Sequence, residues 1–234
     1  MKSKYSIAVV VCAICIIQCT GQSKEPANTG ALKNRADSVG YAFGYNIGEF
    51  LRASGVTDVP ANMNTDMLIR AIKDATGNQK SLMTREQCAV ALNTFVSSKK
   101  TESLSKNKAA GEKFLAENKK KSGIVALPSG LQYQVIKMGT GPKPTPADQV
   151  QIHYVGTLID GTQFESSVER GEPIVHGASR FIAGWNEALL LMPTGSKWKL
   201  FIPSDLAYGD QGSGPAIPPG STLIFEVELL KVNP

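Results

Sequence analysis

The sequence has few of the residues from which metal centres and covalent active sites are built. Among its 234 residues are two histidines, His153 and His176, and no cluster of further metal ligands accompanies them. Nucleophile-elbow, phosphate-loop and dinucleotide-binding glycine motifs are also missing from the sequence. We therefore expect a function that uses no metal, no cofactor and no activated nucleophile.

Charge is also scarce. Charged residues make up 19% of the chain, and 25 Lys and Arg against 20 Asp and Glu give a net charge of +5. A nucleic-acid-binding protein normally carries a denser basic field, so we expect no nucleic-acid partner. The hydrophobic share of 42% excludes a disordered chain and a multi-span membrane protein. The length predicts one or two folded units.

Residues 1–18 have the features of a secretory signal peptide. Two lysines precede an apolar run, Ile7 to Ile17, that is too short to span a bilayer as a stable helix. The run ends in Ile16-Ile17-Gln18-Cys19, which resembles a bacterial lipobox, although plain secretion with an incidental Cys19 is the alternative. We expect lipidation of Cys19, membrane attachment through that lipid, and an extracytoplasmic lipoprotein of the bacterial outer membrane or facing the periplasm.

Residues 19–30 are almost free of apolar side chains and are expected to form a flexible tether.

The remaining cysteine predicts no disulfide. If the leader is removed before Cys19, Cys88 is the only unmodified cysteine, and fold stability must come from packing. Cys88 lies in an apolar helical pattern, which favours a buried structural thiol over a nucleophile.

Residues 31–121 are predicted to form an all-α N-terminal domain. Apolar side chains recur every four residues in its first part, at Val39, Phe43, Ile47 and Leu51, and three glycines follow the same spacing, at Gly40, Gly44 and Gly48. A glycine inside a helix costs about 1 kcal/mol relative to alanine, so three in register need a reason. A glycine groove lets another helix approach closely. The pattern does not decide whether that helix belongs to the same chain or to a second copy.

Two further helices are expected before residue 121. Asn64 or Thr65 can cap one that ends near Gly77. Thr84 and Gln87 have the spacing of a capping box, and 37 residues without proline follow Thr84. The polar middle of this long helix, 97–113, predicts a solvated spacer between the helical domain and the C-terminal part.

Residues 122–234 change from a helical to an alternating period. Strands are expected at 131–136, 150–158, 198–202 and 222–232, with a hairpin turn at Asp160-Gly161. A short helical pattern over 184–190 ends before Pro193. The fold class is therefore predicted as α+β, with a curved antiparallel sheet wrapped on one short helix and preceded by the helical arm.

Six segments of this C-terminal part resemble FKBP-type peptidyl-prolyl cis-trans isomerases. They occur in the family's order and spacing, at Ile152–Gly156, Asp160–Ser167, Ile182–Trp185, Ala207–Gly209, Ile217–Pro219 and Leu223–Leu230. The resemblance covers about residues 148–234. The helical part, with Ala116 to Lys120 before Gly130 to Tyr133, is similar to the arm of Mip-like and FkpA-like bacterial isomerases. Homodimerisation through the N-terminal helices is what this second likeness implies.

The resemblance also implies the site. Trp185 would form the floor of an apolar pocket for proline-containing polypeptides, and Tyr208 and Glu165 would stand at its polar rim, these three being the catalytic candidates. The walls would be Tyr154, Phe164, Phe181, Ile182, Ile217 and Phe225. Such a pocket would ease the X–Pro amide out of its plane without covalent chemistry.

Two departures from the family pattern keep an alternative open. Glu165 stands where the family usually has aspartate, and Phe181 where it usually has valine. The alternative is a client-binding chaperone or adhesion module that retains the FKBP scaffold with little isomerase activity.

His153 precedes the pocket tyrosine on a strand, so it should point to the opposite face, and we expect no catalytic role for it.

Overall fold

The computed structural model describes residues 32–53, 64–77 and 79–234. The predicted signal peptide, the tether and Cys19 lie outside these residues. The chain divides into two units whose boundary falls after Ala42, inside helix α1. Within the described ranges, no helix combines the length and the apolar character needed to cross a membrane.

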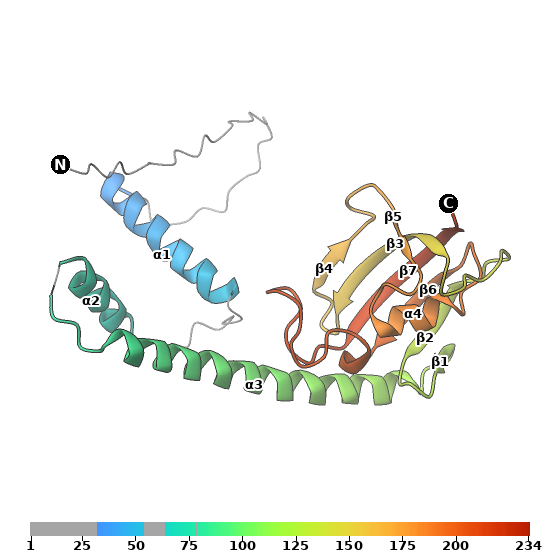
Figure 1. Ribbon diagram of the computed structural model, residues 1–234, viewed down its shortest axis with the longest axis horizontal. Coiled ribbons are helices and arrows are strands. Elements are labelled where there is room, and N and C mark those ends of the chain that lie inside the picture. The colour runs from blue at the N-terminus through green and yellow to red at the C-terminus, as the bar shows by residue number, and fades with distance from the viewer. Residues whose placement is uncertain (1–31, 54–63, 78) are drawn as a thin grey trace, which may run out of the picture. The chain divides into compact units, whose positions relative to one another are not determined.

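Three helices precede the sheet, α1 (Arg35–Ala53), α2 (Thr65–Thr76) and α3 (Arg85–Asn118) (Figure 1). Both predicted caps are confirmed. The Asn64 side chain accepts a hydrogen bond from the Met67 amide. The Thr84 hydroxyl accepts from the Gln87 amide at 3.2 Å, while the Gln87 side chain accepts from the Thr84 amide at 2.9 Å. With 34 residues, α3 is about 51 Å long.

Among the described residues, the helical region shows no hydrophobic core of its own. All residues of the buried core cluster lie between Leu131 and Leu229. Val90 and Leu92 of α3 are 65% and 59% exposed, and Cys88 is exposed as well. The prediction of a buried thiol is therefore wrong for the single chain, because the apolar pattern around Cys88 is left uncovered by the described residues.

Seven antiparallel strands form one sheet in the order β1-β2-β6-β7-β3-β4, and β5 pairs with β3. Their bounds are β1 Ile124–Ala126, β2 Gln132–Lys137, β3 Gln149–Leu158, β4 Gln163–Ser166, β5 Ile174–Gly177, β6 Lys197–Ile202 and β7 Leu223–Val232. The four predicted strands and the hairpin turn after β3 are confirmed. Strands β1, β4 and β5 were not predicted, because three or four residues are too few for a periodic pattern.

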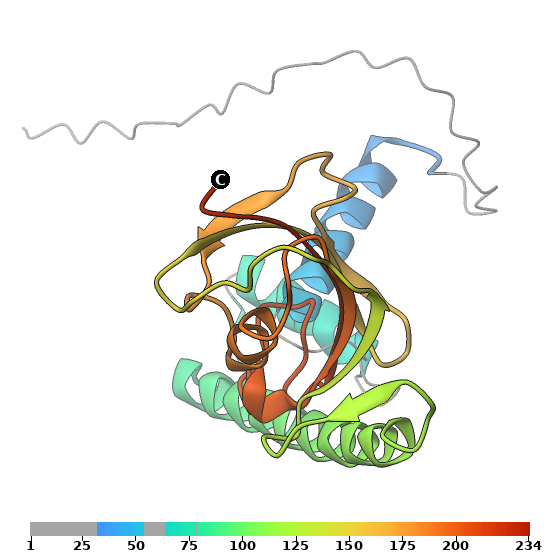
Figure 2. The same cartoon turned by 90° about the vertical axis from the view of Figure 1, so that its right-hand side faces the viewer.

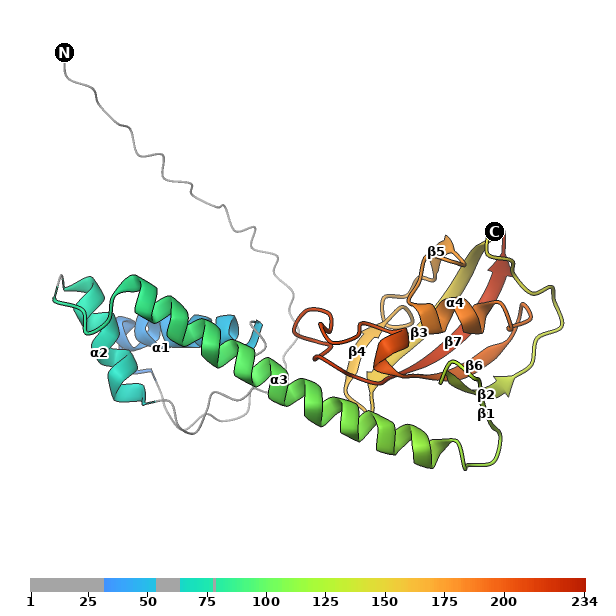
Figure 3. The same ribbon diagram turned by 60° about the horizontal axis from the view of Figure 1, so that its bottom comes forward.

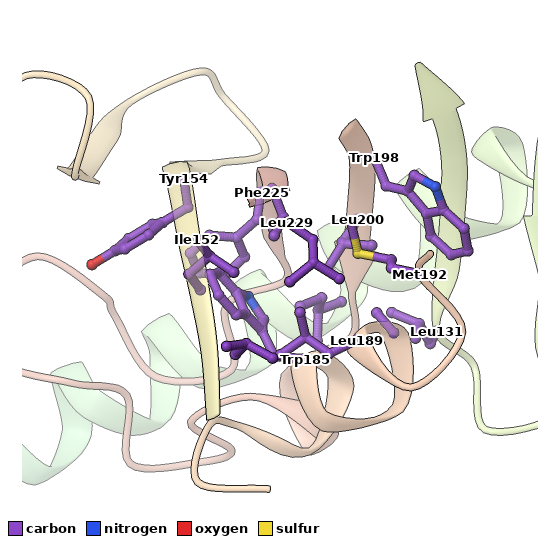
Figure 4. Close-up of a cluster of buried hydrophobic side chains, with 14 of the residues drawn as sticks. Leu131, Ile152, Tyr154, Trp185, Leu189, Met192, Trp198, Leu200, Phe225 and Leu229 are labelled. Carbon is purple, nitrogen blue, oxygen red and sulfur yellow. The ribbon is translucent and has the colours of Figure 1, made fainter. Parts of the chain in front are cut away.

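The sheet curves around helix α4 (Ala183–Leu189), which confirms the predicted α+β architecture (Figure 2). Trp185 and Leu189 of α4 point toward Ile152 of β3 and Leu229 of β7 (Figure 4). Gly184 allows this close packing, since a Cβ there would lie 2.5 Å from the Ile202 side chain. Helix α4 therefore covers the concave face of the sheet and forms the floor of the space between them.

Successive residues of β3 point to opposite faces of the sheet, as predicted. Val150, Ile152 and Tyr154 are buried toward α4. His153, between two of them, has its Nδ1 atom 3.0 Å from the Ser167 hydroxyl on the other face. Tyr154 pairs with Val227 and Gly156 with Phe225 on the neighbouring strand β7. The register thus brings Tyr154 and Phe225 to the same end of the sheet.

The second half of α3 packs against the sheet domain (Figures 1 and 3). The prediction of a solvated spacer over 97–113 is therefore wrong at Gly111, which is buried, while most other residues of that range are exposed. Asn118 and Gln132 are buried, and the Asn118 side chain donates to the Gln132 side-chain oxygen at 3.1 Å. The Gln132 side-chain nitrogen donates to the Leu115 carbonyl at 2.9 Å. Gly111 is buried against Thr222, whose hydroxyl would lie 2.2 Å from an added Cβ. A polar composition concealed this contact, because small and amide side chains make it.

Candidate active site: an aromatic cavity above helix α4

A cavity of about 410 Å³ opens between the sheet, helix α4 and the loop that follows β6. It is lined by Tyr154, Phe164, Glu165, Ile174, Arg180, Phe181, Ile182, Trp185, Tyr208 and Phe225. Eight of the nine residues that the sequence nominated for the pocket are among them. They come from β3, β4, β7, α4 and two loops, so only the folded chain assembles the site.

Three aromatic rings surround the Trp185 indole. Tyr154 and Phe225 meet it edge-on, with ring centroids 5.3 and 5.0 Å away, and Phe181 stacks on it at 5.0 Å. Such pairs contribute about 0.5–1.5 kcal/mol each beyond their buried area. Trp185 is only 3% exposed, and its Nε1 atom has no hydrogen-bond partner among the described residues. The floor of the cavity is therefore an indole held by three ring contacts.

Phe164 and Gly156 form one wall together. The Phe164 ring meets Phe225 edge-on at 5.5 Å. Both rings lie over Gly156 of β3, where an added Cβ would come within 2.6 Å of Phe164 and 2.7 Å of Phe225. Since carbon atoms pack best at about 3.5–4.0 Å, no side chain fits at this position. The glycine is thus required for the aromatic wall.

A hydrogen-bonded group holds the polar rim. The Tyr154 hydroxyl donates to the Glu165 carboxylate at 2.6 Å. Arg170 donates to the same carboxylate oxygen at 3.0 Å and to the Tyr154 hydroxyl at 3.3 Å. Burial raises the pKa of Tyr154, and the bond to Glu165 raises it further. The Glu165 carboxylate is therefore engaged by Tyr154 and Arg170, and it fixes the direction of the tyrosine ring.

Tyr208 stands apart from this group at the mouth of the cavity. It is 40% exposed, and its hydroxyl makes no hydrogen bond within the described part of the chain. Burial, followed by the charge of Glu165, raises the pKa of Tyr208, so that the hydroxyl keeps its proton at neutral pH. Tyr208 is thus a neutral donor available to a ligand.

Ile217 does not line the cavity. Its side chain is 6% exposed within the hydrophobic core, and its backbone amide donates to the Ser213 carbonyl at 3.2 Å. Residues that sequence reasoning did not nominate are Ile174 and Arg180 in the lining and Arg170 behind the rim. Ile174 starts a four-residue strand, and the two arginines lie outside any periodic element. For Arg170, the only signal in the sequence was its place among the charged residues that follow Glu165.

The cavity holds no arrangement suited to a metal. Across the described residues, no group of three or more histidine, cysteine, aspartate or glutamate side chains gathers closely enough to bind one. What the lining offers is an apolar box for a small ring, one free hydroxyl donor in Tyr208 and a charged rim. This set suits binding and orientation of an uncharged ring beside a carbonyl group.

Two family models match the chain. One, described as FKBP-type peptidyl-prolyl cis-trans isomerase, matches residues 141–230. The other, described as the domain amino-terminal to FKBP-type peptidyl-prolyl isomerase, matches residues 36–135. The first covers all the residues that line the cavity, and the second covers α2, α3 and all of α1 but its first residue.

Individual relatives agree with these matches. The FKBP-type peptidyl-prolyl cis-trans isomerase FkpA of Aeromonas hydrophila is 36% identical over 98% of this chain and 94% of that protein. The outer membrane protein MIP of Legionella longbeachae is 41% identical over 87% of this chain and 88% of that protein. The crystal structure of FkpA from Escherichia coli superposes with a TM-score of 0.63 at 35% identity, covering 87% of this chain and 99% of that one. The aromatic cavity, the curved sheet and both halves of the sequence thus agree, and the chain belongs to the family of FKBP-type peptidyl-prolyl cis-trans isomerases.

Proposed function

We propose that the protein accelerates the isomerisation of X–Pro bonds in extracytoplasmic proteins as they fold, with the proline ring held on Trp185. The observation that carries this proposal is the aromatic cavity, in which Tyr154, Phe181 and Phe225 contact the Trp185 indole from three sides. A cavity of about 410 Å³ has room for a proline and the residue before it.

The chemistry needs no nucleophile. Resonance keeps the amide planar and sets a rotation barrier of about 18–20 kcal/mol. In the twisted transition state the amide loses conjugation and with it much of its charge separation, so a water-poor cavity favours this state over the planar ones. Without catalysis the exchange takes tens of seconds at 25 °C.

Three side chains have proposed roles. Trp185 supports the proline ring, and the Tyr208 hydroxyl donates to a carbonyl of the bound segment. Glu165 forms the rim and, through its 2.6 Å hydrogen bond, directs the Tyr154 ring into the cavity. Phe164, Phe181, Ile182 and Phe225 complete the walls. Because Ile217 lies in the core and its amide is paired, we leave it out of the substrate contacts.

We extend the proposal to assembly and location. The protein forms a homodimer through its N-terminal helices and is attached to the membrane by a lipid on Cys19. Exposed apolar side chains on α2 and α3 support the dimer, as does Gly44, where an added Cβ meets nothing within 4 Å. The name of one relative, an outer membrane protein, supports the location.

The test measures cis–trans exchange of a proline peptide by the chain from residue 20 to 234. Variants Trp185→Leu and Tyr208→Phe should lower kcat/KM, while Lys113→Ala, an exposed change on α3, should not. An exchange rate equal to the uncatalysed one for the unaltered chain would refute the enzyme. If the Trp185 and Tyr208 variants lose exchange but still suppress the aggregation of a client protein, other parts of the chain carry a separate chaperone function.

Assembly and lipidation have their own tests. Sedimentation of the same chain at micromolar concentration should show a dimer, and a single monomeric species would contradict it. Mass spectrometry of the mature N-terminus should find a lipid on Cys19.

A further inference from the structure

Helix α3 holds the loop that carries Tyr208. The Lys108 ammonium lies 2.6 Å from the Asp210 carboxylate and 3.7 Å from that of Asp205, on either side of Tyr208 in the sequence. About two turns earlier in α3, Lys100 donates to the Gln211 side chain. Residues 203–222 therefore form a flap that lies along α3, as two views of the chain show (Figures 1 and 3).

The far end of the flap is packed more tightly still. The Asn107 side chain donates to the Pro219 carbonyl at 2.9 Å. At Gly220, where φ is +71°, an added Cβ would lie 2.8 Å from the Leu104 side chain and 3.0 Å from the Leu104 carbonyl. Contacts this close leave no space for water or for a side chain. Helix and flap are thus fitted to each other at backbone level.

A backbone hydrogen bond connects this contact with the active-site tyrosine. The Gly220 amide donates to the Gly209 carbonyl at 3.0 Å, and the Gly209 amide donates to the Ser204 carbonyl at 2.9 Å. Gly209 follows Tyr208 directly. The Tyr208 hydroxyl has no hydrogen bond of its own within the described residues. The backbone on both sides of Tyr208, and not its hydroxyl, therefore sets where the ring stands over the cavity.

We infer that α3 positions the flap over the cavity, with Lys108 and Gly220 acting as positioning residues that fix Tyr208 for the twisted amide. The inference rests on the proposed function and adds to it a route by which the helical arm acts on the isomerase site. A change in how α3 lies on the flap therefore alters the position of Tyr208 and hence turnover.

The charged part of the contact is present at neutral pH. The hydrogen bond to Asp210 raises the pKa of Lys108, which keeps the ammonium charged there. Side chains of Lys108 and Asp210 are 36% and 54% exposed. A pair at that exposure is worth modest energy, so its removal loosens the flap without unfolding the domain.

The experiment compares Lys108→Ala with Lys113→Ala on the chain from residue 20 to 234. Lys113 is exposed on the same helix and serves as the matched control. We expect Lys108→Ala to lower kcat about two- to five-fold with KM nearly unchanged, which corresponds to about 0.4–1 kcal/mol. Lys108→Arg, which keeps the charge, should restore kcat. Gly220→Ala, which forces α3 and the flap apart, should lower kcat more than Lys108→Ala.

Amide hydrogen exchange gives a readout that does not depend on catalysis. The amides of Gly209, Gly212 and Gly220 should exchange faster in Lys108→Ala by a similar factor and remain unchanged in Lys113→Ala. Unchanged exchange and unchanged kcat in both Lys108→Ala and Gly220→Ala would overturn the inference. So would faster exchange with kcat unaltered. An unaltered chain without isomerase activity would overturn the proposed function, and the exchange data would still report whether α3 holds the flap.

Discussion

Replacing Gly156 by alanine tests the aromatic wall directly. The new Cβ would lie 2.6 and 2.7 Å from two Phe164 ring atoms and 2.7 Å from Phe225. To reach ordinary contact, each ring has to move by about 1 Å. Overpacking of this kind costs about 2–3 kcal/mol, and the lower chain entropy of the unfolded alanine variant offsets about 0.4–1 kcal/mol. We therefore expect a net loss of about 1–2.5 kcal/mol in the free energy of unfolding.

The effect on activity should be larger than the effect on stability. A misplacement of about 1 Å in a positioned group can lower a rate by up to about 100-fold, so kcat/KM of Gly156→Ala should fall by about 10- to 100-fold. Denaturant unfolding measures the first quantity and proline-peptide exchange the second. Val155→Ala, on the opposite face of β3, is the control and should leave kcat/KM unchanged.

A second variant separates the clash from the wall. In Gly156→Ala/Phe164→Leu the two clashing ring atoms of Phe164 are absent, so part of the stability should return. Activity should stay low, because the aromatic wall is lost. If Gly156→Ala keeps the stability and kcat/KM of the unaltered chain, the rings are not held by this glycine and the reasoning about the wall is wrong.

Three further predictions concern pH, substrate charge and the helix contact. Because burial raises the pKa of Tyr208 and of Tyr154, kcat should stay flat up to the ordinary tyrosine pKa of about 10. Stability should fall as pH rises beyond that value, since the unfolded state releases these protons first; a pH series of exchange and unfolding checks both, and loss of activity near pH 7 would contradict it. Arg180 lines the cavity, where Glu165 already pairs with Arg170, so peptides with Glu before proline should turn over about two- to five-fold faster than those with Lys. Peptide kinetics at low salt test this, and Arg180→Gln should remove the difference. Asn118→Ala leaves the buried Gln132 oxygen unpaired and should cost about 1–3 kcal/mol in denaturant unfolding, whereas an unchanged midpoint would mean that water replaces the bond.

Local signals in the sequence located most of the elements. The capping box at Thr84 and Gln87, the alternation in β3 and the proline after α4 each act within a few residues, so the sequence alone predicts them. Strands of three or four residues gave no such signal. Burial of Cys88 was predicted wrongly. An apolar pattern indicates a helix face that packs against another surface, but it does not indicate that the same chain provides that surface.

The site depended on two different kinds of information. Ordered motifs nominated eight of the residues that line the cavity. No motif encodes the directions in which side chains point. The sequence therefore did not predict that Glu165 accepts hydrogen bonds from Tyr154 and Arg170, or that Ile217 lies in the core. Contact of α3 with the flap was hidden for a related reason, since Asn107 and Lys108 look like solvated residues in a polar helix.

The amino-acid order by itself determined the periodicity, the caps and the turn glycines of this protein, because these depend on steric preferences and hydrogen bonds between neighbours in the chain. Only the tertiary structure decided which aromatic rings meet at Trp185 and which helix supports Tyr208. Those contacts join residues from Leu104 to Phe225, and their energies arise from shape and burial once the sheet has closed around α4.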